Sequence, residues 1–334
     1  MSDSLEDLIH RADLDDLVRH VDSTCAARDW SHLLRVRDSA RAAVETGRQL
    51  WPIATLANFR LALRAPAEFA ARALDDTART FMPGPVSEIL AVHHSWDELA
   101  PHLPPGHDRA LVAHERSLRG DAIEPREPSL LDIPIAPQPW EPTYALATCD
   151  DDGFDTPPPP CTPAWSPVTA PSTDLVDALS DDETVHAFRQ MMSPWTAGSN
   201  GTAHATVVRG DARVALAVHT RAGATHLAPI TPAEAVAQIA WAAASGGAHG
   251  RRRGAATGRS EAWWLLAVFT GMDEPWPADA DEFGAVIGAL ECFMARTERA
   301  SAAGWEIDLV LEDRDEGISV AMSARDSVES RRTY

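Results

Sequence analysis

The stretch WEIDLVLEDRDEGISVAMS, residues 305–323, decides the fold class of this chain. On both sides of the acidic turn at Asp313–Gly317, apolar residues alternate with polar ones, which is the period of a strand with one buried face. Two such runs joined by a short turn that contains Gly predict an antiparallel β-hairpin. The C-terminal part of the chain is therefore expected to contain a sheet.

Upstream of this hairpin, strand patterns and helix patterns follow one another. A second hairpin is expected where His204–Arg209 and Arg213–His219 flank Gly210-Asp211. Residues 173–334 are therefore predicted to form an α+β domain, in which helices cover one face of a mostly antiparallel sheet. The helices are expected near 181–192, from Thr231-Pro232 onward, at 255–270 and at 280–299.

Residues 1–120 show the period of helices instead. Apolar residues recur every three and four positions, and both Asp29 and the stretch Ser95–Glu98 are typical helix starts. Because no strand-like alternation occurs, we expect a helical domain built as an irregular helical bundle or a short solenoid-like stack. The whole chain is thus predicted to be a helix-rich α+β protein.

A Pro-rich, acidic connector is predicted at 121–172, between the two domains. Thirteen of the 25 prolines lie in residues 121–171, and both proline and charge oppose packing into a core. The stretches 130–135 and 138–144 are too apolar for a free tether, so we expect them to lie against a folded domain. The most mobile part is expected at about 147–172.

The charge of the chain excludes several classes of function. All 29 basic residues are Arg, which removes chemistry that needs Lys, such as Schiff bases and the Walker A nucleotide site. A net charge of −21 argues against general binding to nucleic acid or to an anionic membrane. The exception is residues 186–270, which hold eight Arg and three acids.

The cysteines and the N-terminus indicate a soluble cytoplasmic protein. Cys25, Cys149, Cys161 and Cys292 form no C-x-x-C pair and no metal-ligand spacing, so free thiols in a reducing compartment are expected. The first residues are acidic and lack the apolar core of a signal peptide. No apolar run reaches the ~18 residues that a membrane-spanning helix needs.

The most unusual stretch is GGAHGRRRGAATGRS, residues 246–260, in which Gly recurs at every fourth position. Two arrangements fit it: a continuous helix with a stripe of small residues, or a loop followed by a helix that begins near Ala255. In the second, the first amides of the helix and nearby guanidinium groups would bind an anion. A solvated charge run after the preceding helix is the simpler interpretation. The candidate anion-binding residues are Gly250, Arg251, Arg252, Arg253, Gly254 and Arg259.

Other motifs do not predict catalysis or metal binding. The histidines between His93 and His114 do not share one helix face with their neighbouring acids, so no metal site is expected. The turn Gly198–Gly201 precedes a strand, which is not the strand-to-helix setting of a nucleophilic serine. We therefore expect no catalytic constellation and no cofactor.

Trp263 and Trp264 are the candidate interface residues. Neighbouring residues of a helix point about 100° apart, so these two indoles cannot both face one core. One of them is expected to meet a second surface, such as that of a partner, because large aromatic residues often anchor interfaces. The alternative is a helix that is buried on two sides within one domain.

Two stretches, QPWEPTYAL (138–146) and GRRRGAATGRSEAWW (250–264), carry a family resemblance. Here the chain resembles uncharacterised proteins of GC-rich bacteria that are grouped as a domain of unknown function. The resemblance implies no activity, cofactor or catalytic residue.

The function expected from these observations is non-catalytic. The chain is interpreted as an intracellular interaction or scaffold protein whose partner is another protein or a second copy of itself. The alternative is a protein or enzyme that binds a phosphorylated, nucleotide-like small molecule through the Arg- and Gly-rich stretch 246–260. Membranes are not expected as partners, and nucleic acid conflicts with the net charge.

Overall fold

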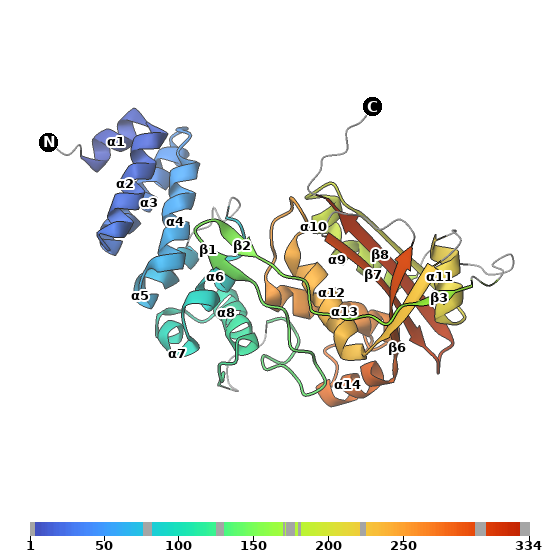
Figure 1. Ribbon diagram of the computed structural model, residues 1–334. Helices are drawn as coiled ribbons and strands as arrows, with labels where there is room; N and C mark the ends of the chain where they lie inside the picture. Colours follow the sequence, from blue (N-terminus) through green and yellow to red (C-terminus); the bar gives the residue numbers. More distant parts are fainter. Residues whose placement is uncertain are drawn as a thin grey trace, which may run out of the picture. The chain divides into compact units, whose positions relative to one another are not determined.

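The computed structural model describes residues 4–75, 82–124, 130–169, 171, 178–179, 182–220, 225–297 and 305–327. The chain forms two compact units (Figure 1). Unit 1 consists of Met1–Pro128 and Ala147–Asp155, and unit 2 consists of Ser129–Leu146 and Thr156–Tyr334. The expected fold class is confirmed, because the N-terminal region is helical and an antiparallel sheet lies in the C-terminal half.

Unit 1 is a set of helices that begin at short polar side chains. Asp29 accepts a hydrogen bond on Oδ1 from the N–H of His32 (2.9 Å), and Ser95 and Glu98 form a capping box. Both helix starts were predicted from the sequence. The elements are α1 (Leu5–Arg11), α2 (Leu14–Ala26), α3 (Trp30–Glu45), α4 (Trp51–Arg64), α5 (Ala67–Ala70), the 3-10 turn η1 (Ala71–Asp75), α6 (Val86–His93), α7 (Trp96–Leu99), the 3-10 turn η3 (Ala100–His102) and α8 (His107–Leu118).

A small hairpin completes unit 1. Strands β1 (Thr148–Asp150) and β2 (Gly153–Asp155) pair antiparallel, with Cys149 opposite Phe154. Asp151 in the turn forms ion pairs with Arg60 and Arg64 of α4. The hairpin is therefore attached to the helices by charge as well as by its backbone.

Unit 2 is built on a six-stranded sheet with the order β3-β5-β6-β7-β8-β4, in which each strand is antiparallel to its neighbours. The hairpin predicted at 305–323 is confirmed, since β7 pairs with β8 and Leu309 lies opposite Met322. The elements are β3 (Ser166–Val168), α9 (Glu183–Met191), α10 (Ser193–Thr196), β4 (Thr202–Arg209), α11 (Ala212–Thr220), β5 (Thr225–Ile230), α12 (Pro232–Ser245), α13 (Ala255–Thr270), α14 (Ala280–Ala289), β6 (Glu291–Thr297), β7 (Trp305–Asp313) and β8 (Ile318–Asp326).

Successive residues of β7 belong to different apolar cores. Leu309 packs in the larger core with α9, α12, α13 and α14, whereas Val310 packs in a smaller core with α11. Because successive side chains of a strand point to opposite faces, α11 covers the face opposite to the other helices. The prediction of helices on one face is therefore wrong for α11.

The hairpin predicted from His204–Arg209 and Arg213–His219 is also wrong. Its second arm is helix α11, because Asp211 Oδ1 accepts hydrogen bonds from the N–H groups of Arg213 and Val214 (3.0 Å each) and caps a helix. Its first arm, β4, pairs with β8 instead. The short apolar run that follows Asp211 fits either a strand or a buried helix turn.

The helix predicted at 280–299 is shorter than expected. Helix α14 ends at Ala289, and Leu290 has an extended backbone, with φ −67° and ψ 141°. Strand β6 begins at once at Glu291 and pairs with both β5 and β7. Strand β5 itself had no counterpart among the expected elements.

The apolar stretches of the predicted connector lie against unit 2, as expected. Ile133 is buried in the larger core, and Trp140 donates from Nε1 to the carbonyl oxygen of Ala280 (3.0 Å). The Trp140 ring lies 4.9 Å from the ring of Trp263, between centroids. Further along the connector, β3 pairs with β5 and extends the sheet.

Candidate functional site

The Arg- and Gly-rich stretch is a loop followed by a helix. Helix α12 ends at Ser245, Gly246 caps it with φ +79°, and α13 begins at Ala255 after Gly254, whose φ is +97°. A side chain at Gly246 would overlap the carbonyl group of Arg251. The arrangement as one continuous helix is therefore wrong, and the glycines serve a tightly folded connection.

The amides of this loop have acceptors inside the protein. Ala248 donates its N–H to Asp326 Oδ2 (2.6 Å), and His249 donates its N–H to Ser199 Oγ (3.1 Å). Asp326, at the end of β8, is only 3% exposed. A carboxylate of the chain itself thus accepts the hydrogen bond of one of the loop amides.

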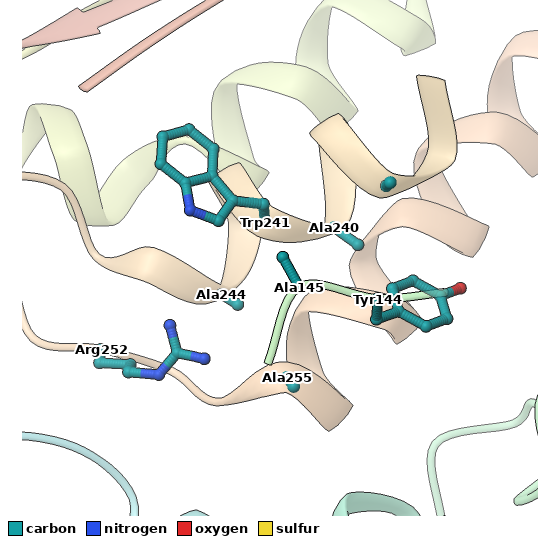
Figure 2. Close-up of a pocket in the computed structure, with 8 residues that line it drawn as sticks. Tyr144, Ala145, Ala240, Trp241, Ala244, Arg252 and Ala255 are labelled. Carbon is teal, nitrogen blue, oxygen red and sulfur yellow. The ribbon is translucent and has the colours of Figure 1, made fainter. Parts of the chain in front are cut away.

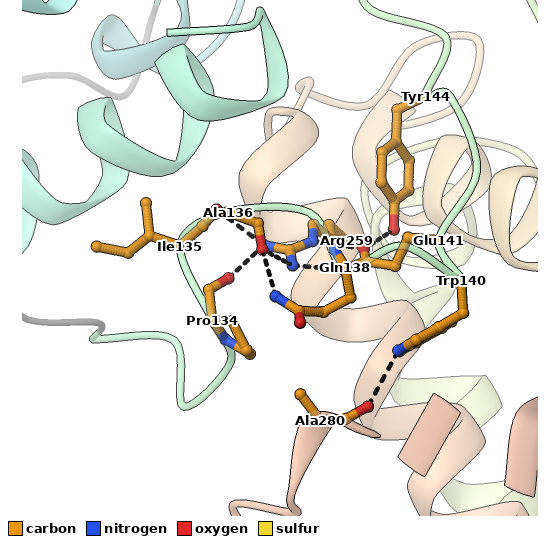
Figure 3. A network of polar contacts seen from close by, with 9 residues as sticks. All are labelled: Pro134, Ile135, Ala136, Gln138, Trp140, Glu141, Tyr144, Arg259 and Ala280. Carbon is orange, nitrogen blue, oxygen red and sulfur yellow. Dashed lines mark hydrogen bonds and ion pairs between the residues drawn. The ribbon is translucent and has the colours of Figure 1, made fainter. Parts of the chain in front are cut away.

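Arg259 is committed to a second internal carboxylate (Figure 3). Its Nε and Nη2 each donate to one oxygen of Glu141 (2.6 Å each), and both side chains are fully buried. The remaining donors of the guanidinium bind the carbonyl oxygens of Pro134 (2.6 Å), Ile135 (3.3 Å) and Ala136 (3.2 Å). Arg259 therefore fastens the segment 130–146 to α13 and has no hydrogen-bond donor left for a ligand.

The pKa values of this network follow from the same contacts. Burial opposes ionisation of Glu141, but the hydrogen bonds and the charge of Arg259 outweigh it and hold the pKa of Glu141 below its ordinary value. Burial, followed by the negative charge of Glu141, raises the pKa of Tyr144 well above its ordinary value. Tyr144 donates its hydroxyl proton to Glu141, so the carboxylate is surrounded by donors.

The three consecutive arginines point to different surroundings. Arg251 is exposed, and Arg253 forms an ion pair with Glu261. Arg252 is buried and lines a small pocket with Tyr144 and Trp241 (Figure 2). The pocket has a volume of about 10 Å³, which is room for about one water molecule. The predicted anion-binding residues are thus neighbours in the chain without converging on one cavity.

We expect inorganic phosphate and nucleotides to leave the melting temperature of the chain unchanged, because Asp326, Glu141 and Glu261 already bind the amide of Ala248 and the guanidinium groups of Arg259 and Arg253. A phosphate bound at 100 times its dissociation constant would add about 2.7 kcal/mol to the free energy of unfolding. A thermal-shift series measures this. A saturable rise that Arg252→Ala removes would contradict the expectation.

Trp263 and Trp264 face opposite environments, as their spacing on a helix requires. Trp263 is 1% exposed and packs against Trp140 and Phe283, with 4.9 Å between ring centroids in both pairs. Trp264 is 39% exposed. Of the two candidate interface residues, Trp264 is the one that faces solvent.

Trp264 pairs with a second indole that no motif of the sequence predicted. The ring of Trp276, in the connection between α13 and α14, lies 5.5 Å from that of Trp264 at an interplanar angle of 81°. The signal for Trp276 is its place between two prolines in an acidic connection; its half-buried ring also packs against the edge of the larger core. We call Trp264 and Trp276 together the indole pair.

The indole pair is bordered by acidic chain. Residues 271–282 contain five acids and no Arg, and every one of the five except the half-buried Asp273 is exposed. The nearest helix start in this stretch is capped by Asp279, whose Oδ1 accepts from the N–H groups of Asp281 and Glu282 (3.0 Å each). The five acids are Asp273, Glu274, Asp279, Asp281 and Glu282.

Metal ligands do not gather in the part of the chain that the structure describes. No group of three or more His, Cys, Asp and Glu side chains there is placed to hold a metal ion. Among the histidines, His93 donates from Nε2 to the carbonyl oxygen of Cys149 (3.0 Å), and His114 is buried in α8. Within the same residues, no helix is both long enough and apolar enough to cross a bilayer.

Comparison with other proteins gives one match. A search of curated proteins and a search of solved structures returned nothing similar. The model of a family described as "Family of unknown function (DUF6183)" matches residues 15–326, which takes in both units and the segments that connect them. The chain therefore belongs to this family.

Proposed function

We propose that this chain is an interaction or scaffold protein that binds another protein through the indole pair. The observation that carries the proposal is the position of Trp264, which is 39% exposed in edge-to-face contact with Trp276. Trp is the residue type that most often dominates the binding energy of an interface. An indole left in water by an otherwise well-packed helix supports a role outside the core.

The partner that this surface fits is a basic segment of another protein. Five acids and no Arg border the indole pair in residues 271–282, so the local charge attracts cations. An Arg or Lys side chain placed over an indole gains about 0.5–2 kcal/mol from the ring, depending on how far it is desolvated. Charge and aromatic surface therefore favour the same kind of partner.

A cytoplasmic location is part of this proposal. Cys25, Cys149, Cys161 and Cys292 are all free thiols, and this supports a reducing compartment. Burial raises the pKa of Cys292 to about 12, so this thiol stays protonated and inert at neutral pH.

The test compares Trp264→Ala with Trp51→Ala, since Trp51 is equally exposed, at 39%, but lies in unit 1. The probe is a fluorescein-labelled peptide of alternating Arg and Ser, with a Glu/Ser peptide as its counterpart, at about 0.15 M salt. We expect the Arg/Ser peptide to bind and the Glu/Ser peptide not to bind. Trp264→Ala should weaken it about fivefold to thirtyfold, or about 1–2 kcal/mol, and Trp51→Ala should leave it unchanged. Fluorescence anisotropy measures both.

Three outcomes would speak against the proposal. Equal binding of both peptides would show that charge does not select the partner. Equal losses in the two Trp variants would show nonspecific attraction to an acidic chain. Self-association in gel filtration that Trp264→Ala abolishes would identify a second copy, and not a basic segment, as the occupant.

A further inference from the structure

A row of polar side chains crosses the sheet of unit 2 on the face that α11 partly covers. Ser323 of β8 lies opposite His204 of β4 and opposite Asp308 of β7. Residues two apart on a strand share a face, so this row lies next to Val310 and Ala321, which pack under α11. Ser323 and Asp308 are half-buried, and His204 is exposed. On this face of the sheet, the apolar patch under α11 therefore gives way to a polar patch that solvent can reach.

His219, near the end of α11, lies over this row. Its Nε2 is 2.8 Å from Ser323 Oγ, and its Nδ1 is 2.9 Å from Thr206 Oγ1. In the tautomer with the proton on Nδ1, the ring donates to Thr206 and accepts the hydroxyl proton of Ser323 on Nε2. A hydroxyl in contact with a base that a third group orients is the arrangement of an activated nucleophile.

Burial and charged neighbours shift the pKa values of His219 and Asp308 in opposite directions. Burial, helped by the nearby His204 and Arg325, lowers the pKa of His219 to about 4. Burial and a hydrogen bond with Glu306 raise the pKa of Asp308 to about 7, against the opposing effect of Arg325. Arg325 itself forms ion pairs with Glu306 (2.8 Å) and Asp308 (2.9 Å). Two groups whose environments separate their pKa values in this way suit a base and an acid at one site.

We propose that Ser323 is the nucleophile of an acyl-transfer site that hydrolyses carboxylic esters with good leaving groups, an activity independent of the docking surface. Ser323 Oγ forms a bond to the carbonyl carbon while its proton passes to Nε2 of His219. The bond to the leaving alcohol breaks, and the alcohol departs with that proton. Water then attacks the acyl-serine, gives one proton to Nε2, and releases the acid as Ser323 regains its hydroxyl proton.

Residues of β7 and β8 next to Ser323 supply the acid and the positive charge of the site. Asp308, opposite Ser323, is the acid of the site: its proton exchanges Glu306 as hydrogen-bond acceptor for the carbonyl oxygen of the ester, which becomes negative. Arg325 contributes positive charge two residues further along β8. A base as weak as His219 favours leaving groups that need little protonation, which selects aryl esters over amides.

The experiment labels the full chain with a fluorophosphonate probe and follows hydrolysis of p-nitrophenyl acetate. We expect the probe on Ser323, and Ser323→Ala and His219→Gln should each lower the ester rate about 10²-fold to 10⁴-fold. Ser319→Ala is the matched control, because Ser319 lies on the same strand and donates to the carbonyl oxygen of Gly210 (2.7 Å), away from His219. It should keep the full rate.

The pH profile separates this site from background hydrolysis. The base must be deprotonated and the acid protonated, so the rate should rise above about pH 4 and fall above about pH 7. Thr206 is a positioning residue: Thr206→Val should lower kcat and move the acidic limb, and Thr206→Ser should restore both. If Ser323→Ala lowers the melting temperature but leaves labelling and hydrolysis unchanged, the hydroxyls only satisfy a buried imidazole and the proposal is overturned.

Discussion

Replacing Arg259 with Ala is expected to lower the free energy of unfolding by about 3–5 kcal/mol. The substitution leaves the carboxylate of Glu141, which is fully buried, without its cation. It also removes the donors for the carbonyl oxygens of Pro134, Ile135 and Ala136. Breaking one side of a buried ion pair costs far more than the pair itself contributes, because an uncompensated charge stays in a medium of low dielectric constant.

The matched variant is Arg259→Met with Glu141→Leu, measured by urea unfolding followed by circular dichroism. This pair removes both charges, so we expect a clearly smaller loss than that of Arg259→Ala alone. The folded-state pKa of Glu141 lies below its ordinary value. Its stabilising effect is therefore present above the ordinary carboxyl pKa and is lost as the pH falls through the folded value. If the double variant lost as much free energy of unfolding as the two single variants together, this account would be contradicted.

Gly258→Ala is expected to destabilise the chain by about 1–3 kcal/mol, although Ala is the better helix former. Gly258 lies in α13 where α12 crosses it closely, and an added Cβ would overlap the carbonyl oxygen of Ala240 and lie 2.6 Å from Ala244 Cβ. Backbone cannot move aside as a flexible side chain can. The two helices must therefore separate, and they form the main layer over the sheet.

Gly288→Ala is the control for this prediction. Gly288 also lies in a helix, α14, but a Cβ there would meet nothing within 4 Å. We expect it to gain about 0.4–1 kcal/mol, because Ala reduces the entropy of the unfolded chain. Thermal unfolding of both variants should give shifts of opposite sign. A gain in both would show that α12 and α13 can part at little cost.

Local signals predicted the parts of the fold that short stretches specify. The hairpin of β7 and β8 was predictable because alternation and turn lie within 19 residues, 305–323. The start of α12 was predictable because Thr231 and Glu234 form a capping box and Pro232 occupies the first helical position, all within four residues. These interactions depend on neighbours in the sequence alone.

The prediction of secondary structure failed mainly at short apolar runs. Residues 213–219 would suit a strand or a buried turn of helix, and the cap at Asp211 decides for the helix. The helix predicted at 280–299 was too long, because Leu290 takes an extended backbone although neither it nor its direct neighbours are Gly or Pro.

The contacts of the candidate sites could not be predicted either, because they join residues far apart in the sequence. Helix geometry predicted that Trp263 and Trp264 have different surroundings, but it did not predict which of them is exposed; Trp264, expected on the buried face, is the exposed one. The pairing of Arg259 with Glu141 spans 118 residues, and that of His219 with Ser323 spans 104. No local pattern encodes a contact at such a separation. A single sequence therefore shows the arginines, but it does not show which carboxylates of the same chain bind them.

The chain passes between its two units three times, after Pro128, after Leu146 and after Asp155. A gene exchange with one breakpoint between codons 141 and 259 would join Arg259 to a foreign version of the segment that holds it. Each half would then inherit only one side of a buried pair. We expect such hybrids to fold stably only where the foreign segment also supplies a carboxylate at the position of Glu141.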